Sequence, residues 1–504
     1  MKAHKINLGT LLMIEAGLLL VGYSSPAQNI SFANDVPAMS TKQNTAELQQ
    51  QAASLVYTYA YPLLTTYLTG KDLRYKSQPL DTFESIINFT TPPTYKFVGV
   101  VRANIDTLYS NAWFDLSSSP VVIEVTEPID QYFLIQVLDG YLNAIQYMGT
   151  PLKQKNPKAI LIQEGYSSNP LIQSYINRGY QLIRCPTSLG WILIRTGTEN
   201  GLAATNATQH KYVFKPLYPQ KIPAKTTILS SGLPVYEQIA NMPPQQLLPL
   251  LAKLLVNNPP SEEDKHLGIV QQLSILGIKA GRPNVESANW NLNAIKKGFA
   301  SANAEIVNWQ NTKVAKQANW ESKGWFTSIS KKTAKYGTDY LMRAYYSYAG
   351  FGANSVDQAI YSLSFTDSAG KQYKSSETYV VHFPAGQLPP VNEKGFWSLT
   401  LYNGSSFFAY NSELNKDQQI YAINSYSKYV LNSDGSLDIC IQRKKPKNNN
   451  GSCKLSNWLP APTNPQYKGL IADQFSIMLR MYWPSYSVDE LADHWSPPVV
   501  RVIK

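Results

Sequence analysis

The most constraining feature of this sequence is the alternation of apolar and polar residues over two long stretches. The first stretch runs from residue 97 to about 195 and the second from 359 onward, and Pro, Gly, Ser and Asn interrupt both. Short strands at this spacing favour a β-sandwich or barrel. A leucine-rich region with helical periodicity lies between them. The order along the chain is therefore β, then α, then β.

We predict an α+β fold, mainly β, with two antiparallel β-sandwich domains of the jelly-roll type and a helical segment between them. Asn44 and Glu47 are spaced as in a capping box and predict a helix at the start of the first domain. The predicted parts are a signal peptide, a linker, an N-terminal domain, a helical segment and a C-terminal domain, at residues 1–27, 28–43, 44–230, 231–355 and 356–504.

The first residues predict export. Two lysines precede an apolar run at residues 8–21, and Ser25 and Ala27 stand at the −3 and −1 positions of a cleavage site. The alternative is a membrane anchor. The run has 14 residues, short of the roughly 20 that span a bilayer, and Glu15 interrupts it. We therefore expect a periplasmic or secreted protein without a transmembrane segment after cleavage.

Composition excludes several classes of protein. Charged residues make up 16% and apolar residues 44% of the chain, and mean hydropathy is −0.25, which excludes a disordered chain and a protein with several membrane spans. The formal net charge of +11 raises nucleic acid or a membrane surface as a partner. Most basic residues are scattered, however, and we predict no nucleic-acid partner.

One dense basic run occupies residues 443–447. Asn and Gly residues follow it, and one proline lies within it, so we predict a solvated loop. The alternative is a site for phosphate or an anionic glycan. Three cysteines are present, and in an oxidising compartment two of them can pair. Cys440 ends a strand-like run and Cys453 follows the basic loop, so these two are the disulfide candidates. Cys185 is predicted to be a buried thiol.

Compact signatures of common catalytic and metal sites are missing from the sequence. It contains no HExxH, CxxC, GxSxG or GxxxxGK[S/T] motif. The histidines beyond the predicted leader are separated by more than fifty residues: His210, His266, His382 and His494. We predict no metal site and no cofactor, and catalytic residues stay unassigned.

The densest group of polar residues contains Arg102, Asn104, Asp106 and Tyr109. In a structural interpretation Asp106 caps local backbone amides and Arg102 pairs with it. In a functional interpretation the four side chains surround a cleft and offer N–H donors, an amide, a carboxylate and a phenol, a set that suits a polar or anionic ligand. Both interpretations stay open.

A second group lies in the C-terminal β region and contains Trp397, Tyr402, Trp458 and Arg480. Alternation places Trp397 on the opposite strand face from Tyr402. Tryptophan and tyrosine beside amides form sugar-binding platforms, but the core of a β-sandwich uses the same residues. Core packing is the favoured interpretation.

These motifs resemble bacterial proteins that join domain-of-unknown-function family 1254, at the N-terminal side, to domain-of-unknown-function family 1214. The N-terminal match comprises Arg102-x-Asn104-x-Asp106-Thr107-x-Tyr109, Asp115-Leu116, Pro120, Tyr132, Asp139-Gly140-Tyr141-x-Asn143, Pro186-Thr187 and Arg195. The C-terminal match comprises Phe396-Trp397-Ser398-Leu399-Thr400-x-Tyr402, Asn411, Tyr421-x-Ile423, Asp434-Gly435-Ser436, Asn457-Trp458-Leu459-Pro460-Ala461-Pro462 and Arg480-x-Tyr482-x-Pro484.

The resemblance implies an exported or envelope-associated protein with β-sandwich domains, and it brings no activity, cofactor or substrate. Two functions remain. The first is binding of a small polar or sugar-like ligand at a cleft between the two β domains. The second is a hydrolase or lyase for a small polar or carbohydrate-like substrate, with Asp106 as acid or base and Arg102 and Tyr109 stabilising charge. A homo-oligomer is compatible with both.

Overall fold

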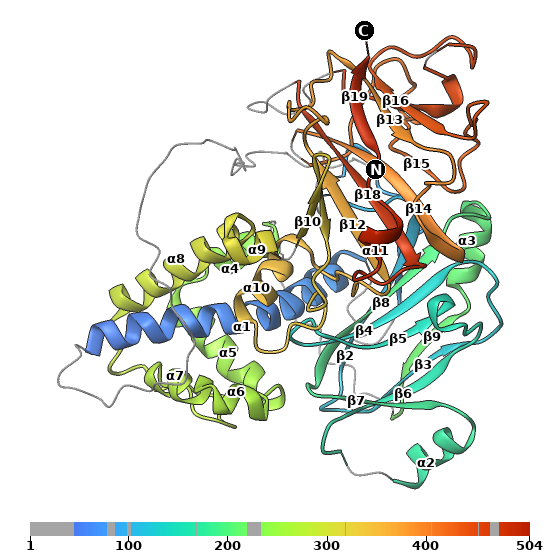
Figure 1. The fold of residues 1–504 in the computed structure, drawn as a ribbon. Coiled ribbons are helices and arrows are strands. Elements are labelled where there is room, and N and C mark those ends of the chain that lie inside the picture. The colour runs from blue at the N-terminus through green and yellow to red at the C-terminus, as the bar shows by residue number, and fades with distance from the viewer. Residues whose placement is uncertain are drawn as a thin grey trace, which may run out of the picture. The chain divides into compact units, whose positions relative to one another are not determined.

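The computed structural model describes residues 45–77, 86–97, 102–166, 169–218, 233–317, 319–404, 406–451, 453–463 and 473–503. The predicted signal peptide and linker lie outside these residues, as does the predicted limit between 230 and 231. The described part of the chain forms four β-sheets and a group of helices around the long helix α1, Thr45–Ser77 (Figure 1).

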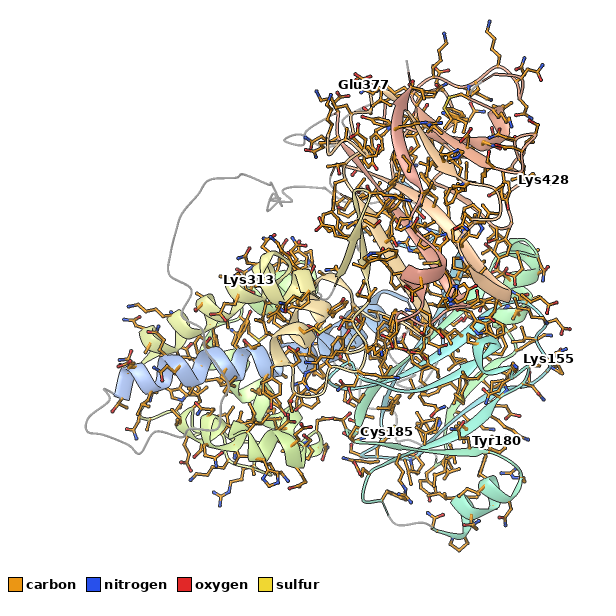
Figure 2. All side chains as sticks on the ribbon, in the orientation of Figure 1. Lys155, Tyr180, Cys185, Lys313, Glu377 and Lys428 are labelled. Carbon is orange, nitrogen blue, oxygen red and sulfur yellow. A yellow bond between two sulfur atoms is a disulfide. The ribbon has the colours of Figure 1, made fainter. Side chains whose placement is uncertain are left out.

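Two sheets form the N-terminal β half. The first inner sheet has the strand order β1-β2-β8-β4-β5, and the first outer sheet has the order β7-β6-β3-β9. Their bounds are β1 Ile87–Asn88, β2 Thr107–Asp115, β3 Val121–Val125, β4 Phe133–Asp139, β5 Ala144–Gly149, β6 Lys158–Gln163, β7 Gln181–Cys185, β8 Leu189–Gly197 and β9 Tyr212–Pro216. Cys185 ends β7 and is buried as predicted (Figure 2).

Two further sheets form the C-terminal β half. The second inner sheet has the order β10-β11-β12-β18-β14-β15, and the second outer sheet has the order β17-β16-β13-β19. Their bounds are β10 Asn319–Ser322, β11 Trp325–Ser328, β12 Ala359–Ser364, β13 Thr378–Phe383, β14 Val391–Asn403, β15 Ala422–Asn424, β16 Leu437–Gln442, β17 Trp458–Pro460, β18 Phe475–Pro484 and β19 Val499–Ile503. The hairpin β10–β11 lies within the residues predicted to be helical and joins this sheet.

The mixed α+β fold with β regions on both sides of a helical region is confirmed. The prediction of purely antiparallel sheets is wrong for two pairs, because β6 runs parallel to β7 and β16 runs parallel to β17. Helix α2, Pro170–Asn177, connects β6 to β7. It carries the chain back to the end of the sheet at which β6 begins, as a parallel pair of strands requires. The jelly-roll topology stays a prediction.

Each β half encloses its own core between an inner and an outer sheet. In the N-terminal half Phe133 and Ile135 of β4 pack with Ile123 of β3. In the C-terminal half Leu399 of β14 packs with Ile439 of β16. These residues face one side of their strands, as the period-two pattern predicts.

The opposite faces of the two inner sheets pack against each other. Leu134 of β4 shares a hydrophobic cluster with Phe396 of β14 and Tyr482 of β18. Both faces of these strands are therefore covered, and all nine residues of β8 are buried. We call this contact between the inner sheets the junction. Polar residues of the predicted site lie on strands and loops beside it.

The helices pack mainly around α1. They are α4 Val235–Ala240, α5 Pro244–Asn257, α6 Glu262–His266, α7 Ile269–Ile275, α8 Leu292–Asn308, α9 Lys313–Gln317 and α10 Tyr340–Ala349, while α3 Leu202–Gln209 and α11 Leu491–His494 lie in the β halves. Helix α1, predicted to open the first β domain, shares a hydrophobic cluster with α5, α7, α8 and α10 and with Tyr141 and Leu189 of the N-terminal half. Gly298 of α8 permits the closest approach, since a Cβ atom there would lie 2.3 Å from the carbonyl oxygen of Gln50.

Candidate functional site at the junction

The segment before β2 is held by the C-terminal half through its backbone. Arg102 has a left-handed backbone with φ of 51°, and its carbonyl oxygen accepts a hydrogen bond from Nη2 of Arg480 at 2.9 Å. The next carbonyl oxygen, of Ala103, accepts from the hydroxyl group of Tyr402 at 2.7 Å. Arg480 also donates to that hydroxyl group at 2.7 Å. The two predicted groups of residues therefore meet.

Asn104 fixes the turn that leads into β2. Its Oδ1 atom accepts from the backbone N–H of Asp106 at 2.7 Å, and its Nδ2 atom donates to Thr107 at 3.0 Å. The same Nδ2 atom donates to the hydroxyl group of Tyr482 at 2.8 Å. One amide thus satisfies a local turn and links the two β halves.

Asp106 is fully buried, at 0% exposure. Its Oδ1 atom accepts from Nδ2 of Asn424 at 2.9 Å, whereas Oδ2 has no hydrogen-bond partner among the described residues. Burial raises the pKa of this carboxyl group, and Asn424, Arg480 and Ser398 act in the opposite direction. A buried oxygen that lacks a donor costs free energy, so Oδ2 of Asp106 is an unsatisfied acceptor beside the junction.

The predicted pair between Arg102 and Asp106 is wrong. No ion pair joins these two described residues. The guanidinium group of Arg102 lies over the ring of Phe365 at 5.7 Å, and its buried Nε atom lacks a partner. The reason is the left-handed backbone at Arg102, which gives its carbonyl oxygen rather than its side chain to the junction.

Arg195 of β8 is a buried cation that neither of the two predicted groups of site residues includes. It is 4% exposed, and it donates to Oε1 of Gln136 at 2.8 Å and to the carbonyl oxygen of Gly352 at 2.5 Å. Neither Arg195 nor Arg480 forms an ion pair with a carboxylate in the described part of the chain. Arg195 belongs to the motif that carries the family resemblance, and this membership could have identified it as a candidate site residue.

Tyrosines surround the two arginines. The guanidinium group of Arg195 lies over the ring of Tyr109 at 5.7 Å, and the ring centroids of Tyr361 and Tyr482 lie 6.4 Å apart. Tyr361 accepts a hydrogen bond from Nδ2 of Asn354 at 3.2 Å. Burial raises the pKa of both Tyr361 and Tyr482, so their hydroxyl groups stay protonated and can donate.

Solvent reaches part of this group. Tyr109 and Tyr361 keep intermediate exposure although each lies within an inner-sheet strand, whereas Arg195 and Arg480 are buried. Tyr132 contributes a further buried hydroxyl oxygen that lacks a hydrogen-bond partner among the described residues. The junction therefore combines two unpaired cations, partly accessible phenols and buried oxygens without partners.

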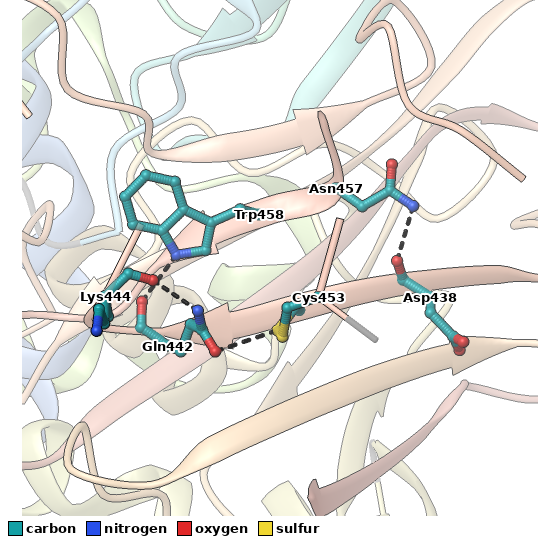
Figure 3. Close-up of a disulfide and its surroundings, with 7 residues drawn as sticks. Asp438, Gln442, Lys444, Cys453, Asn457 and Trp458 are labelled. Atoms are coloured by element: carbon teal, nitrogen blue, oxygen red, sulfur yellow. Dashed lines mark hydrogen bonds between the residues drawn. A yellow bond between two sulfur atoms is a disulfide. The ribbon is translucent and has the colours of Figure 1, made fainter. Parts of the chain in front are cut away.

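The two tryptophans are not part of the junction. Trp397 is 3% exposed and packs in the C-terminal core between Phe383 and Tyr429. Trp458 is 1% exposed, and its indole N–H donates to the carbonyl oxygen of Gln442 at 2.8 Å (Figure 3). Both therefore serve the core, and neither offers a face to a sugar.

The motif around Asp139 has a structural role. Its carboxylate accepts from the backbone N–H groups of Tyr141 and Asn143 at 2.9 and 2.8 Å. Nearby, the guanidinium group of Arg343 lies over the rings of Tyr59 and Tyr141 at 5.4 and 4.7 Å. This contact attaches the helices to the first inner sheet.

Other features lie apart from the junction residues. Cys440 and Cys453 form a disulfide with a Cα–Cα distance of 5.3 Å (Figure 3). A hollow of about 700 Å³ is lined by Lys253 of α5 and by Trp290, among others. Among the described residues, no group of three His, Cys, Asp or Glu could hold a metal ion. None of the described helices is both long and apolar enough to span a bilayer.

Comparison with known families gives the two β halves their assignment. Residues 83–216 match the family described as a protein of unknown function, DUF1254, and residues 358–486 match DUF1214. The chain pairs these two domains. Arg195, Asp106 and Tyr109 lie in the DUF1254 match, and Arg480 and Tyr482 lie in the DUF1214 match. The junction is therefore the contact between DUF1254 and DUF1214.

A solved structure shows the same fold. The VPA0106 protein from Vibrio parahaemolyticus is similar over 92% of this chain and 100% of its own, with 16% identity and a TM-score of 0.61. An uncharacterized protein from Burkholderia cenocepacia covers 91% of this chain and 94% of its own, with 11% identity and a TM-score of 0.42. No curated protein matches the DUF1254–DUF1214 chain.

Proposed function

We propose that this chain is an exported envelope protein that binds a small polar ligand bearing an anionic group at the junction of DUF1254 and DUF1214. The observation that carries the proposal is the pair of buried arginines. Arg195 and Arg480 are 4% and 3% exposed, and within the described part of the chain they donate hydrogen bonds to neutral oxygens alone. Buried charges in proteins are usually paired, so an anion would supply the missing partner.

The neighbouring groups support a ligand with hydroxyl groups as well as an anionic group. Tyr109, whose ring lies 5.7 Å from the guanidinium group of Arg195, and Tyr361, which pairs with Arg480 in the register of β12 and β18, are partly exposed phenols. Asp106 Oδ2 is an acceptor without a donor. Phenols and guanidinium groups donate, and the carboxylate accepts, which together suit a sugar acid or a hydroxy acid. With Asp106 ionised the two arginines leave one positive charge in excess.

Export is part of the same proposal. The leader pattern at residues 1–27 supports it, and so does the disulfide between Cys440 and Cys453, since disulfides persist in oxidising compartments. Mass spectrometry of the protein recovered from the periplasm or medium tests this part. We expect an N-terminus at Gln28, and an intact N-terminus on recovered protein would contradict it.

A hydrolase or lyase that uses Asp106 is the second candidate. The observation in its favour is the raised pKa of a buried carboxyl group with one free oxygen, a property that catalytic acids share. Arg102 does not assist in the predicted way, because its guanidinium group points to Phe365. Binding is therefore the better supported function.

The test is a thermal-shift screen of the purified protein against sugar acids, hydroxy acids, inorganic phosphate and neutral oligosaccharides. A ligand at a hundredfold its dissociation constant stabilises the fold by about 2.7 kcal/mol. We expect anionic compounds to raise the melting temperature and neutral ones to leave it unchanged. Tyr109→Phe and Tyr361→Phe should weaken a hit about tenfold, since each removes one hydrogen bond.

Tyr212→Phe is the matched control. Tyr212 is a buried tyrosine whose hydroxyl group contacts Thr196, and its ring packs in the N-terminal core rather than at the junction. The control should keep the full ligand response. Equal responses in all three variants, or no response of the parent to any anion, would remove the proposal. Turnover of a confirmed ligand that is lost in Asp106→Asn would favour the enzyme instead.

A further inference from the structure

The disulfide-closed loop of the C-terminal half forms a surface outside the junction. Its tip carries Lys444, Lys445 and Lys447, which are exposed. These three lysines lie within four positions and form no ion pair in the described part of the chain. The local electrostatic potential is therefore more positive here than around most of the scattered basic residues.

The base of this loop is fixed. The disulfide Cys440–Cys453 closes it (Figure 3), and Arg443 pairs with Asp473 at 2.8 Å. Asn449 Oδ1 of the loop accepts from the backbone N–H of Ser456, which follows the disulfide, at 2.9 Å. The lysines therefore project from a constrained base, which lowers the entropy lost on binding a surface.

Two exposed aliphatic residues lie beside the loop. Val430 and Leu431 are 40% and 45% exposed. Lys454 donates to the carbonyl oxygen of Leu431 at 3.1 Å, and Asn457 donates to that of Val430 at 2.8 Å. These bonds attach the aliphatic pair to the residues that directly follow the disulfide, so apolar and cationic side chains share one region.

Charges around this region are mostly positive. Lys428, two residues before Val430, is exposed at the edge of the C-terminal half (Figure 2). The nearby acid Asp434 is exposed and accepts a hydrogen bond from the hydroxyl group of its neighbour Ser436 at 2.7 Å. Lysines next to protruding aliphatic side chains are the combination that anionic lipid surfaces attract.

We propose that the lysine loop 443–451 and the aliphatic pair Val430–Leu431 dock the protein on a membrane surface that contains anionic lipids. The lysines contact the headgroups, and the two aliphatic side chains enter the interface between headgroups and acyl chains. A soluble polyanion would use the lysines alone and would leave Val430 and Leu431 without a role. The aliphatic pair therefore favours a lipid surface.

Vesicle co-sedimentation of the purified full chain tests the proposal, with the same N-terminus in every variant. The vesicles contain phosphatidylcholine alone or an equal mixture with phosphatidylglycerol. We expect binding to the mixed vesicles and not to the neutral ones. Combined Lys444→Ala, Lys445→Ala and Lys447→Ala should lower partitioning at least about tenfold, since each lysine near such a surface contributes appreciably.

A second variant separates lipid docking from simple charge attraction. Val430→Ser with Leu431→Ser keeps every charge and should lower partitioning at least about threefold. Lys296→Ala with Lys297→Ala on α8 is the control, because both lysines are exposed and the described ion pairs do not include them. Each variant must keep the parent's circular dichroism spectrum and melting temperature.

Three outcomes would overturn the proposal. One is equal binding to neutral and mixed vesicles, and another is an equal loss of binding in the α8 control. The third is binding to heparin or nucleic acid that depends on the loop lysines while the mixed vesicles stay unbound. That result would assign the loop to a soluble polyanion.

Discussion

Arg480 of β18 donates to the backbone carbonyl oxygen of Arg102, 378 positions earlier in the chain, at a distance of 2.9 Å. The same guanidinium group donates to Thr400 and Tyr402. A single buried cation thus connects the segment before β2 to two neighbouring strands of the C-terminal half. A side chain in this position affects folding even if no ligand ever reaches it.

Arg480→Met tests this connection. The change leaves a buried carbonyl oxygen and two hydroxyl groups without their donor, and we expect a loss of about 2–4 kcal/mol in the free energy of unfolding. Urea denaturation monitored by fluorescence measures it. Arg184→Met on the exposed face of β7 is the control and should change stability by less than about 0.5 kcal/mol. Equal losses in both variants would show that the arginine contacts carry no specific stability.

The variant Asp106→Asn tests how the buried carboxyl group of Asp106 affects the pH dependence of stability. Burial raises the folded-state pKa of Asp106 above the ordinary value of about 3.9. Between these two pKa values the folded state binds more protons than the unfolded state. The free energy of unfolding therefore increases as pH falls through this interval and decreases as pH rises through the folded-state pKa. We expect Asp106→Asn to remove that contribution.

The measurement compares the melting temperatures of the parent and Asp106→Asn from pH 4 to pH 8. The difference between the two should move in favour of the parent toward acid. The control is Asp115→Asn, which removes a carboxyl group at the partly exposed end of β2. Parallel curves for the parent and Asp106→Asn would mean that Asp106 has the same proton affinity in both states.

A turn before β2 was predictable from the sequence, but its capping side chain was not: the prediction assigned this role to Asp106, whereas in the structure Asn104 accepts from the backbone N–H of Asp106. Asn104 and Asp106 stand two positions apart, and a side chain that accepts from the N–H group two residues on is a common turn. The bond from Asn104 to Tyr482 spans 378 positions and depends on which faces of two sheets meet. The period-two pattern of each strand shows which residues share a face, but it does not show which two faces pack against each other.

The tryptophans and the first helix show a related limit. Trp397 and Trp458 suit both a core and a sugar platform, and burial decides between them only in the folded chain. Helix α1 packs with α8, about 240 positions away, a contact that the sequence of the helix does not indicate. The short helix α2, which connects the parallel strands β6 and β7, was not among the predicted elements.

Replacement of the disulfide cysteines should lower stability through the unfolded state. Cys440 and Cys453 are 13 positions apart, and closing a loop of this length contributes about 3 kcal/mol in the chain-entropy description. We expect Cys440→Ser with Cys453→Ser to lose about that amount in urea denaturation. Dithiothreitol should then destabilise the parent and leave the double variant unchanged. An equal effect of the reductant on both would contradict the assignment of this pair.

Cys185 should resist thiol reagents until the N-terminal core opens. It is 0% exposed, and burial raises the pKa of its thiol well above the ordinary range, so the reactive thiolate is scarce at neutral pH. We expect no labelling by a disulfide-exchange reagent in native buffer and one labelled thiol per chain in denaturant.

Because the cysteine lies between the two sheets of the N-terminal half, its labelling rate in intermediate urea reports on the opening of that half. Variants of Arg480 disrupt the junction, and they should accelerate this labelling only if the junction also stabilises the N-terminal core. An unchanged rate in Arg480→Met, despite lower global stability, would show that the two halves open independently.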